Sequence, residues 1–227
     1  CSSDLKLQPT GELPAKLAEL WRAGDTALAS WVWAVLEQDA PTLEFLERYL
    51  AGRTSRADME RQIYSRDLAP VPEVLVAPLG IQTRPDLIVR PANAEEVSMI
   101  LRHARRHRVA VTPRASASTV YFNSVPYRKG ILLDLNSLRG EPVLDEKRAT
   151  VRVGAAIRWA ELDEWLRGRG WAALTYPTSA PSATVGGWFC MEGYGIGSLA
   201  FGCVHEQAVA ARVVLPDGEV LEATPAS

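Results

Sequence analysis

The apolar positions of the first 65 residues recur at the spacing of helices. Leucine, tryptophan and valine side chains follow this period from Leu13 to Val35 and again from Leu43 to Leu50. Pro41 and Gly52 stand where a helix over the second stretch would begin and end. We therefore expect a helical N-terminal appendage over residues 1–65, and none of its residues indicates catalysis or ligand binding.

The stretch from residue 66 to residue 85 has no helical period. Prolines occupy four of its positions. Each proline removes a backbone donor and restricts φ, which disfavours helices and central strands. A Pro-rich extended linker is predicted over residues 66–85, with the main domain beginning at residue 86.

From residue 86 onward, short apolar runs alternate with helical periods. Residues 86–90 have the pattern of a buried strand, and Asn93 with Glu96 has the spacing of a capping box at the start of a helix. Residues 109–112 and 131–135 have the pattern of two further strands. This order predicts a β-α-β unit with a long loop after its second strand.

A similar unit is predicted next. Residues 149–153 alternate as a strand, the helical period around Leu162 ends at Gly170, and residues 171–175 return to extended structure. A glycine-rich stretch, 184–202, follows.

The last predicted element is a β-hairpin. Residues 209–215 and 220–222 are apolar runs on either side of Asp217-Gly218. That dipeptide is typical of a turn with positive φ at both central residues. The complete pattern predicts an α+β fold.

Composition and charge exclude several classes of function. The formal net charge of −2 gives no basic face for nucleic acid, and no run approaches the ~18 apolar residues of a transmembrane helix. Three cysteines and three histidines are too few and too scattered for a disulfide scaffold or a metal site. His103 and His107 have ligand-compatible spacing, but the arginines around them favour a solvated basic face. No metal is expected.

The location of the protein is inferred from the same features. We expect a cytoplasmic protein and leave peripheral attachment to a membrane open. The first residue, Cys1, is compatible with a trimmed chain or with processing at a lipoprotein-type cysteine, and we favour trimming.

The first stretch that indicates chemistry runs from Pro113 to Thr119. Its small residues follow a predicted strand, where a ligand can approach the backbone closely. Successive N–H groups, together with Ser and Thr hydroxyls, can bind a phosphate there. A small-residue loop packed against a neighbour explains the composition equally well.

The second stretch is the glycine-rich one. Thr184-Val185-Gly186-Gly187 leads into further glycines with aromatic and aliphatic residues between them. This pattern favours a backbone pressed against a large flat ligand, and a glycine-rich loop without a ligand is the alternative. The glycine spacing matches neither a Rossmann fingerprint nor a P-loop.

Five segments in series resemble the FAD-binding domain of the vanillyl-alcohol-oxidase (PCMH-type) flavoprotein family, in its D-lactate and glycolate dehydrogenase branch. They are Pro85 to Pro91 with Glu95 to Val97, the Pro113-Arg114 loop, Pro177-Thr178-Ser179, Thr184 to Gly187 with Phe201-Gly202, and Val214 to Gly218. The resemblance covers about residues 64–223. It implies a PCMH-type domain of two α/β subdomains, about 86–138 and about 139–227.

The resemblance also implies FAD as the cofactor and assigns its contacts. The pyrophosphate would lie on the backbone N–H groups of Arg114, Ala115, Ser116, Ala117, Ser118 and Thr119. The isoalloxazine and ribityl chain would run beside Pro177, Thr178, Ser179, Thr184, Val185, Gly186 and Gly187. The second half of the site would close at Gly197, Ser198 and Gly202, with the adenine near Val213 and Val214.

Two features depart from the family's pattern. The family's pyrophosphate loop carries several glycines where this chain has Ala115, Ser116 and Ala117. A side chain at positive φ there would cost about 1 kcal/mol or more, which serine hydroxyls would have to offset. The family's domain also continues beyond the hairpin into another glycine-containing segment and a substrate-binding cap. The domain is therefore expected to be C-terminally incomplete, with a partner chain or a missing C-terminal region supplying the cap.

The resemblance implies an FAD-dependent oxidoreductase in which the hydride at C2 of a small 2-hydroxy acid passes to flavin N5. No catalytic base is assigned. His205 and Glu206 fall beside the cofactor segment, but a capping or surface role is the stronger interpretation of His205, and Cys190 is expected to be a small buried residue. The alternative function is a non-catalytic structural subunit with weak or no flavin binding, which the alanine-serine loop favours.

Overall fold

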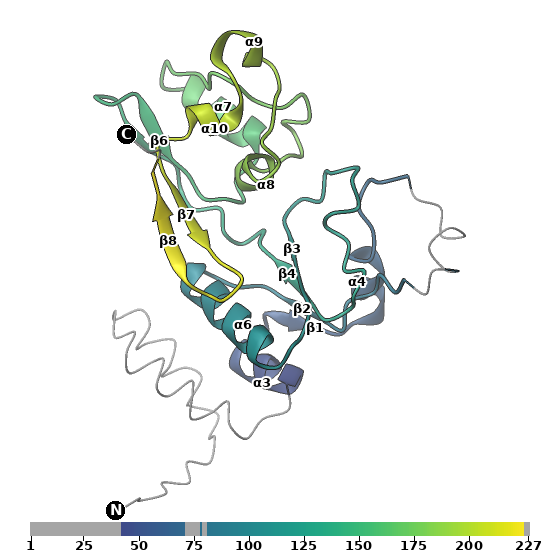
Figure 1. Cartoon of the computed structure of the whole chain (residues 1–227). Coiled ribbons are helices and arrows are strands. Elements are labelled where there is room, and N and C mark those ends of the chain that lie inside the picture. Colours follow the sequence, from purple (N-terminus) through teal and green to yellow (C-terminus); the bar gives the residue numbers. More distant parts are fainter. Residues whose placement is uncertain (1–41, 71–77, 79–80, 225–227) are drawn as a thin grey trace, which may run out of the picture. The chain divides into compact units, whose positions relative to one another are not determined.

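The structure, a computed structural model, describes residues 42–70, 78 and 81–224 (Figure 1). The helices expected between Leu13 and Val35 lie outside these residues. The chain divides into two compact units, Cys1–Thr54 and Ser55–Ser227. In the first unit, helix α3 (Thr42–Tyr49) buries Leu46, and Leu50 just beyond its end is buried as well. Gly52 follows with a φ of 77°, which confirms the second predicted helix and its end.

A parallel sheet forms the base of the second unit. Strand β4 (Ile131–Asp134) lies between β2 (Leu87–Val89) and β3 (Val111–Arg114) and runs parallel to both. Every residue of β2 and β4 is buried, as the uninterrupted apolar runs predict for parallel strands covered on both faces. The strand predicted over residues 109–112 begins later, because Val109 still donates its backbone N–H to a carbonyl of the preceding helix.

Helix α6 (Ala94–Arg106) connects β2 to β3 and confirms the predicted capping signal. The Asn93 side chain accepts a hydrogen bond from the Glu96 N–H at 2.9 Å. His103 on this helix is fully buried, and its ring centroid lies 4.6 Å from that of His107. The prediction of a solvated basic face is therefore wrong for His103, because the helix turns this side chain towards the core while its arginines stay exposed.

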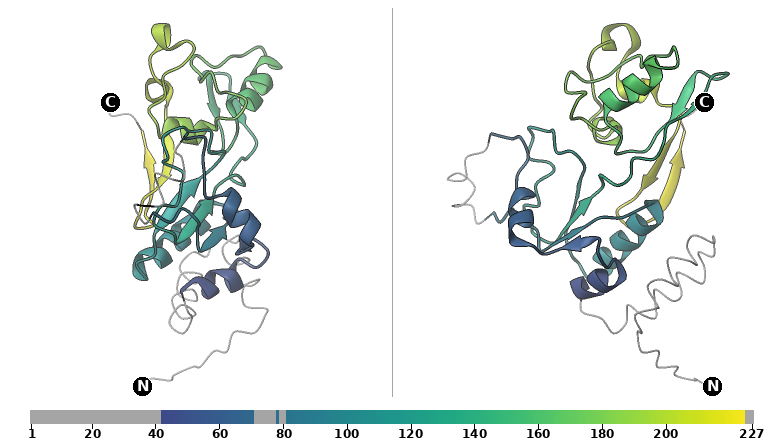
Figure 2. Two further views of the ribbon diagram at one scale, coloured as in Figure 1. Left: turned by 90° about the vertical axis from the view of Figure 1, so that its right-hand side faces the viewer. Right: turned by 180° about the vertical axis from the view of Figure 1, so that it is seen from behind.

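The predicted hairpin is present and packs against α6 (Figure 2). Strands β7 (Ala211–Val214) and β8 (Val220–Ala223) are antiparallel, with Val214 opposite Val220. Of the two turn residues, only Gly218 has positive φ, at 82°. The expectation of positive φ at both positions is wrong, because the turn closes from Leu215 to Gly218 and Pro216 holds its second position at negative φ.

Between the sheet and the hairpin the chain forms short helices and a two-stranded ribbon. The helices are α7 (Trp159–Arg167), α8 (Val185–Phe189), α9 (Ser198–Phe201) and α10 (Val204–Gln207). The ribbon joins β5 (Val143–Asp145) to β6 (Thr150–Arg152), and only β6 was predicted. The extended segment expected at 171–175 forms no strand, since only Tyr176 pairs there, through an isolated bridge to Ile196. We call residues 154–207 the helical part and residues 81–138 the sheet part.

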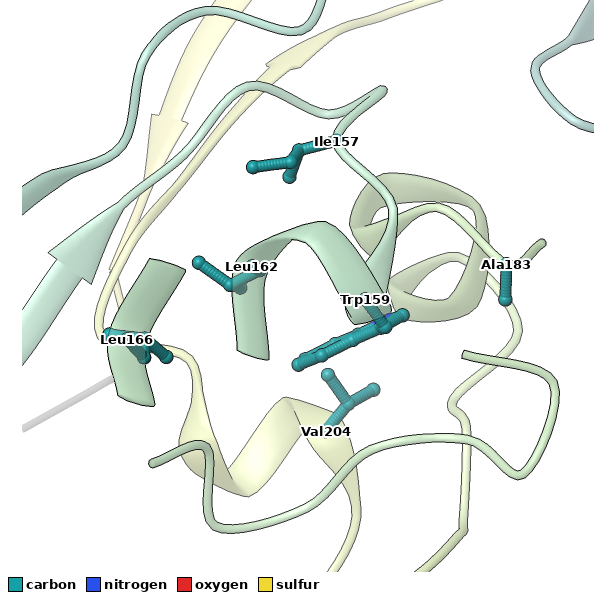
Figure 3. Packing of buried hydrophobic residues seen from close by; sticks show 6 residues of the cluster. All are labelled: Ile157, Trp159, Leu162, Leu166, Ala183 and Val204. Carbon is teal, nitrogen blue, oxygen red and sulfur yellow. The ribbon is translucent and has the colours of Figure 1, made fainter. Parts of the chain in front are cut away.

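The helical part has its own apolar core (Figure 3). Trp159, Leu162 and Leu166 lie on one face of α7 and are nearly fully buried, as their helical spacing predicts. The Trp159 ring meets the Trp188 ring edge-on, with centroids 5.3 Å apart. Ile157, Ala183 and Val204 complete the same cluster. This core holds α8 and α10 against α7.

A strand-like pairing brings α8 close to the start of the helical part. The Gly186 N–H donates to the Ala155 carbonyl at 2.8 Å, and the Val185 N–H donates to the Ile157 carbonyl at 2.9 Å. A Cβ on Gly186 would lie 2.7 Å from the Ala155 Cβ and 3.0 Å from its carbonyl oxygen. Residue 186 therefore has no room for a side chain while this pairing is intact.

We expect Gly186→Ala to destabilise the protein without any ligand, by about 1–3 kcal/mol, because the added methyl overpacks against Ala155. Urea unfolding followed by circular dichroism measures this. Gly168→Ala is the matched control. Gly168 has a φ of −61° and 3.6 Å to the nearest atom, so this change should stabilise by about 0.4–1 kcal/mol. Equal stability of Gly186→Ala and the unmodified chain would contradict the packing described here.

Candidate functional site

A buried carboxylate stands at the carboxyl end of the central strand. Asp134, the last residue of β4, is 4% exposed. Its Oδ2 accepts a hydrogen bond from the Tyr64 hydroxyl at 2.6 Å and lies 3.3 Å from Nε of Arg90. Its Oδ1 accepts from both the backbone and the side-chain nitrogen of Asn136. Burial raises the pKa of Tyr64, and the bond to Asp134 raises it further, so the phenol keeps its proton as donor.

The same network anchors the loop that the sequence predicts to bind phosphate. The Asn136 side chain donates to the Ala115 carbonyl at 3.1 Å, and the Leu135 N–H donates to the Arg114 carbonyl at 2.8 Å. Both contacts use carbonyl oxygens. They fix the start of the loop to the end of β4 and leave its N–H groups available.

The Arg114 side chain donates hydrogen bonds to backbone carbonyls of the protein. Its Nη1 donates to the carbonyl of Arg66 at 2.6 Å, with longer contacts to the carbonyls of Tyr64 and Ser124. Its guanidinium carbon lies 5.2 Å from the centre of the Tyr64 ring. Burial lowers the pKa of this guanidinium. Arg114 therefore joins three chain segments, and its positive charge remains beside the loop.

The conformation of the loop suits an anion. Ala117 has a φ of 52°, so one of the three positions where the family carries glycine adopts a left-handed conformation with a side chain present. Within the described residues, the backbone N–H groups of Ala115, Ser116, Ala117 and Ser118 donate no hydrogen bond. Unsatisfied successive N–H groups around a left-handed residue form the kind of nest that binds phosphate oxygens.

A cleft of about 580 Å³ opens in front of this loop. The sheet part and the segments next to it contribute Ile63, Tyr64, Arg114, Ala115, Ser116 and Asn136, and the rest of the lining is Arg139, Arg158, Pro181 and Ser182. The lining contains three guanidinium groups and no carboxylate. The residues present therefore fit the diphosphate of FAD, which needs both hydrogen-bond donors and positive charge.

The sequence did not single out Tyr64, Asn136, Arg139 or Arg158. The available signals were positional: Asn136 follows directly on a predicted strand, Arg139 comes three residues later, and Arg158 precedes the helix that begins at Trp159. Tyr64 had no such signal, since it reaches Asp134 from 70 residues away.

The other predicted cofactor residues lie on the helical part and the hairpin. Thr178 and Ser179 occupy an exposed turn after the buried Pro177, and Thr184 caps α8 by accepting from the Gly187 N–H. The Ser198 hydroxyl bonds the Thr175 hydroxyl at 2.8 Å and the Gly195 N–H at 2.8 Å. Of all predicted cofactor residues, Arg114, Ala115 and Ser116 line the cleft. Contacts of FAD with all of the predicted residues stay predictions.

Several glycines of the 184–202 stretch are required by the protein's own packing. A Cβ on Gly197, at a φ of 89°, would fall 2.1 Å from the Leu174 carbonyl oxygen. One on Gly195 would fall 2.2 Å from the Tyr176 carbonyl oxygen, and one on Gly193 would enter the Trp188 ring. Close approach of backbone to backbone explains Gly195 and Gly197, and contact with the Trp188 ring explains Gly193, without a flat ligand.

The structure gives His205 contacts with Phe189 and Glu192 and leaves Cys190 exposed. Nε2 of His205 lies 2.7 Å from the Phe189 carbonyl oxygen and must donate to it, so Nδ1 is the nitrogen that faces Glu192, at 3.8 Å. The imidazole also packs on the Phe189 ring, with centroids 4.3 Å apart, which supports the structural interpretation of His205. Cys190 is exposed, so the expectation of a buried residue is wrong.

Across residues 42–70, 78 and 81–224, no helix has the length and apolarity needed to cross a membrane.

Sequence comparisons relate the chain to oxidoreductases. A mitochondrial D-lactate dehydrogenase (cytochrome) of Arabidopsis thaliana is 28% identical over 139 residues, covering 61% of this chain and 24% of that protein. The glycolate oxidase subunit GlcD of Bacillus subtilis is 25% identical over 161 residues, covering 71% of this chain and 32% of the subunit. The chain thus spans about a quarter to a third of these relatives.

Solved structures share the fold. An alkyldihydroxyacetonephosphate synthase superposes with a TM-score of 0.69 at 23% identity, over 80% of this chain and 37% of the synthase. The 6-hydroxy-D-nicotine oxidase of Arthrobacter nicotinovorans superposes with a TM-score of 0.62 at 19% identity, over 77% and 36% of the two chains. These likenesses confirm the predicted α+β, PCMH-type fold. The family described as FAD binding domain matches residues 85–224, and the chain belongs to this family of FAD-binding domains.

Proposed function

We propose that this chain is the FAD-holding portion of an oxidoreductase that acts on a small 2-hydroxy acid. The observation that carries the proposal is the loop that begins at Arg114. The N–H groups of Ala115 to Ser118 donate no hydrogen bond within the described residues, and the start of the loop lines a cleft that also contains Arg139 and Arg158. The matched family and the D-lactate and glycolate relatives support the same reaction class.

The chain's own residues bind and orient the cofactor in this proposal. The N–H groups of Ala115 to Ser118 bind its diphosphate, and Asn136 holds the start of that loop on β4. The turn at Pro177 to Ser179 and the first turn of α8 lie beside its remaining length. When bound, FAD supplies the acceptor, at flavin N5, for the hydride on C2 of the substrate.

The substrate's own contacts belong, in this proposal, to parts of the protein outside these residues. The relatives are three to four times as long as the matched stretch. Hydride transfer requires the reacting carbon within about 3–3.5 Å of its acceptor in an aligned pose, and a covering domain or partner chain would fix that pose and exclude water.

One observation favours the alternative of a structural subunit with weak or no flavin binding. Ala117 holds a left-handed conformation that glycine adopts without strain. The two functions differ in a direct way, since an FAD-holding chain purifies yellow or takes up FAD stoichiometrically and a structural subunit does neither.

We expect Ser116→Pro to weaken FAD binding roughly tenfold or more, because proline deletes an N–H donor to a charged group. Ser116→Ala is the matched control, since it removes the hydroxyl and keeps the N–H, and its affinity should change much less. Titration of FAD fluorescence measures both. Equal FAD affinity in Ser116→Pro and the unmodified chain, with circular dichroism unchanged, would refute backbone binding at this loop.

We also expect the 227-residue chain, loaded with FAD, to show no reduction of its flavin by D-lactate or glycolate at ordinary enzyme rates. The measurement is anaerobic bleaching of the flavin absorbance at saturating 2-hydroxy acid, with dithionite as the control that the bound flavin is reducible. Rapid bleaching by either acid would show that these residues contain the substrate site themselves.

A further inference from the structure

We infer that Arg139 and Arg158 form a two-arginine clamp for the cofactor's diphosphate, with Glu161 as the counter-ion that the diphosphate displaces. This rests on the proposed function and assigns two binding residues and one regulating residue to its site.

The backbone holds both arginines at the wall of the cleft. The Leu138 carbonyl accepts a hydrogen bond from the Ala156 N–H at 3.0 Å. A Cβ on Gly154 would lie 1.7 Å from the Arg139 carbonyl oxygen, so the chain crosses itself tightly at this point. Arg158 stands at the N-terminus of α7 and pairs with Thr184 through an antiparallel bridge. Two positions 19 residues apart thereby line the same cleft as the loop residues Ala115 and Ser116.

Among the residues that the structure describes, the two guanidinium groups share one carboxylate partner at long distances. Arg139 Nη1 lies 3.3 Å and Arg158 Nη1 lies 3.5 Å from the same oxygen, Oε1 of Glu161. Charge-assisted hydrogen bonds between such groups are ordinarily about 2.7–2.9 Å long. Both side chains are nearly half exposed, at 45% and 44%. One carboxylate at these distances leaves an excess positive charge and most of the N–H donors of both forks unused.

An incoming diphosphate is a better partner for this pair than Glu161. It carries more negative charge than one carboxylate and offers oxygens to two guanidinium forks at once. The loop carries alanine and serine where the family has glycine, which weakens its binding of diphosphate by the backbone. The positive charge of the two arginines offsets this weakening. Arg114 is held in another position, since its Nη1 donates to the backbone carbonyls of Tyr64, Arg66 and Ser124.

The role of Glu161 gives a prediction of opposite sign. Its carboxylate competes with the diphosphate for both arginines, so neutralising it releases them. The backbone N–H of Arg158 donates a hydrogen bond to Oε2 of Glu161 at 3.4 Å. Glu161→Gln keeps an acceptor for this bond and so preserves the start of α7. A tighter complex after removal of a carboxylate is a result that a purely structural role of this triad does not produce.

The test is titration of the 227-residue chain with FAD, ADP and riboflavin, at low and high salt. Arg139→Gln and Arg158→Gln should each weaken FAD and ADP roughly tenfold and flatten the salt dependence of binding, with riboflavin unchanged. Glu161→Gln should tighten FAD and ADP several-fold. Arg167→Gln is the matched control, because Arg167 lies on the same helix, pairs with Asp163 at 2.7 Å and lies outside the cleft lining.

Two results would overturn the clamp. The first is that both arginine variants bind FAD and ADP as tightly as the unmodified chain. The second is that their riboflavin affinity falls as much as their FAD affinity, which would show a general loss of the site. A chain that binds ADP with the expected variant pattern but does not bind FAD would refute the proposed function and support the clamp.

Discussion

The buried carboxylate of Asp134 imposes the constraint on which the site depends. A charge at 4% exposure is costly unless it is paired and hydrogen-bonded, and here both oxygens have partners. Tyr64, Arg90 and Asn136 satisfy it from three different segments. Because the buried charge is stable only with these partners, the three segments that carry them lie together at the carboxyl end of β4. Asn136 in turn fixes the start of the loop Ala115–Ser118, because its side chain donates a hydrogen bond to the Ala115 carbonyl.

Arginines near this loop have different roles because their burial differs. The Arg114 guanidinium lies over the Tyr64 ring, and its Nη1 donates to backbone carbonyls. Arg139 and Arg158 stay half exposed around a distant carboxylate. A guanidinium in that setting keeps its donors in contact with solvent and can exchange partners at low cost. Arg114 therefore holds chain segments together at the cleft, whereas Arg139 and Arg158 provide positive charge that can exchange partners.

The glycine-rich stretch shows that a pattern typical of a ligand-binding segment can be explained by the packing of the protein itself. Gly186 and Gly197 are needed where backbone crosses backbone, and this packing shapes the turn and the helix start that the family resemblance places beside FAD. The fold requirement comes first, since it holds without any ligand. A glycine in a presumed ligand segment is thus weak evidence for contact with the ligand until its neighbours are known.

The sequence by itself determined the local elements and the family. The Asn93 cap, the buried runs of β2 and β4, the face of α7 and the final hairpin were all predictable, because period and capping depend on neighbours within a few residues. Five short segments in order were enough to predict the FAD-binding fold. The tertiary structure alone decided that His103 is buried, that Tyr64 reaches Asp134, and that Arg139 and Arg158 converge on Glu161. These contacts join residues far apart in the chain, or depend on which face of a helix is buried. Only the packing of whole elements decides both.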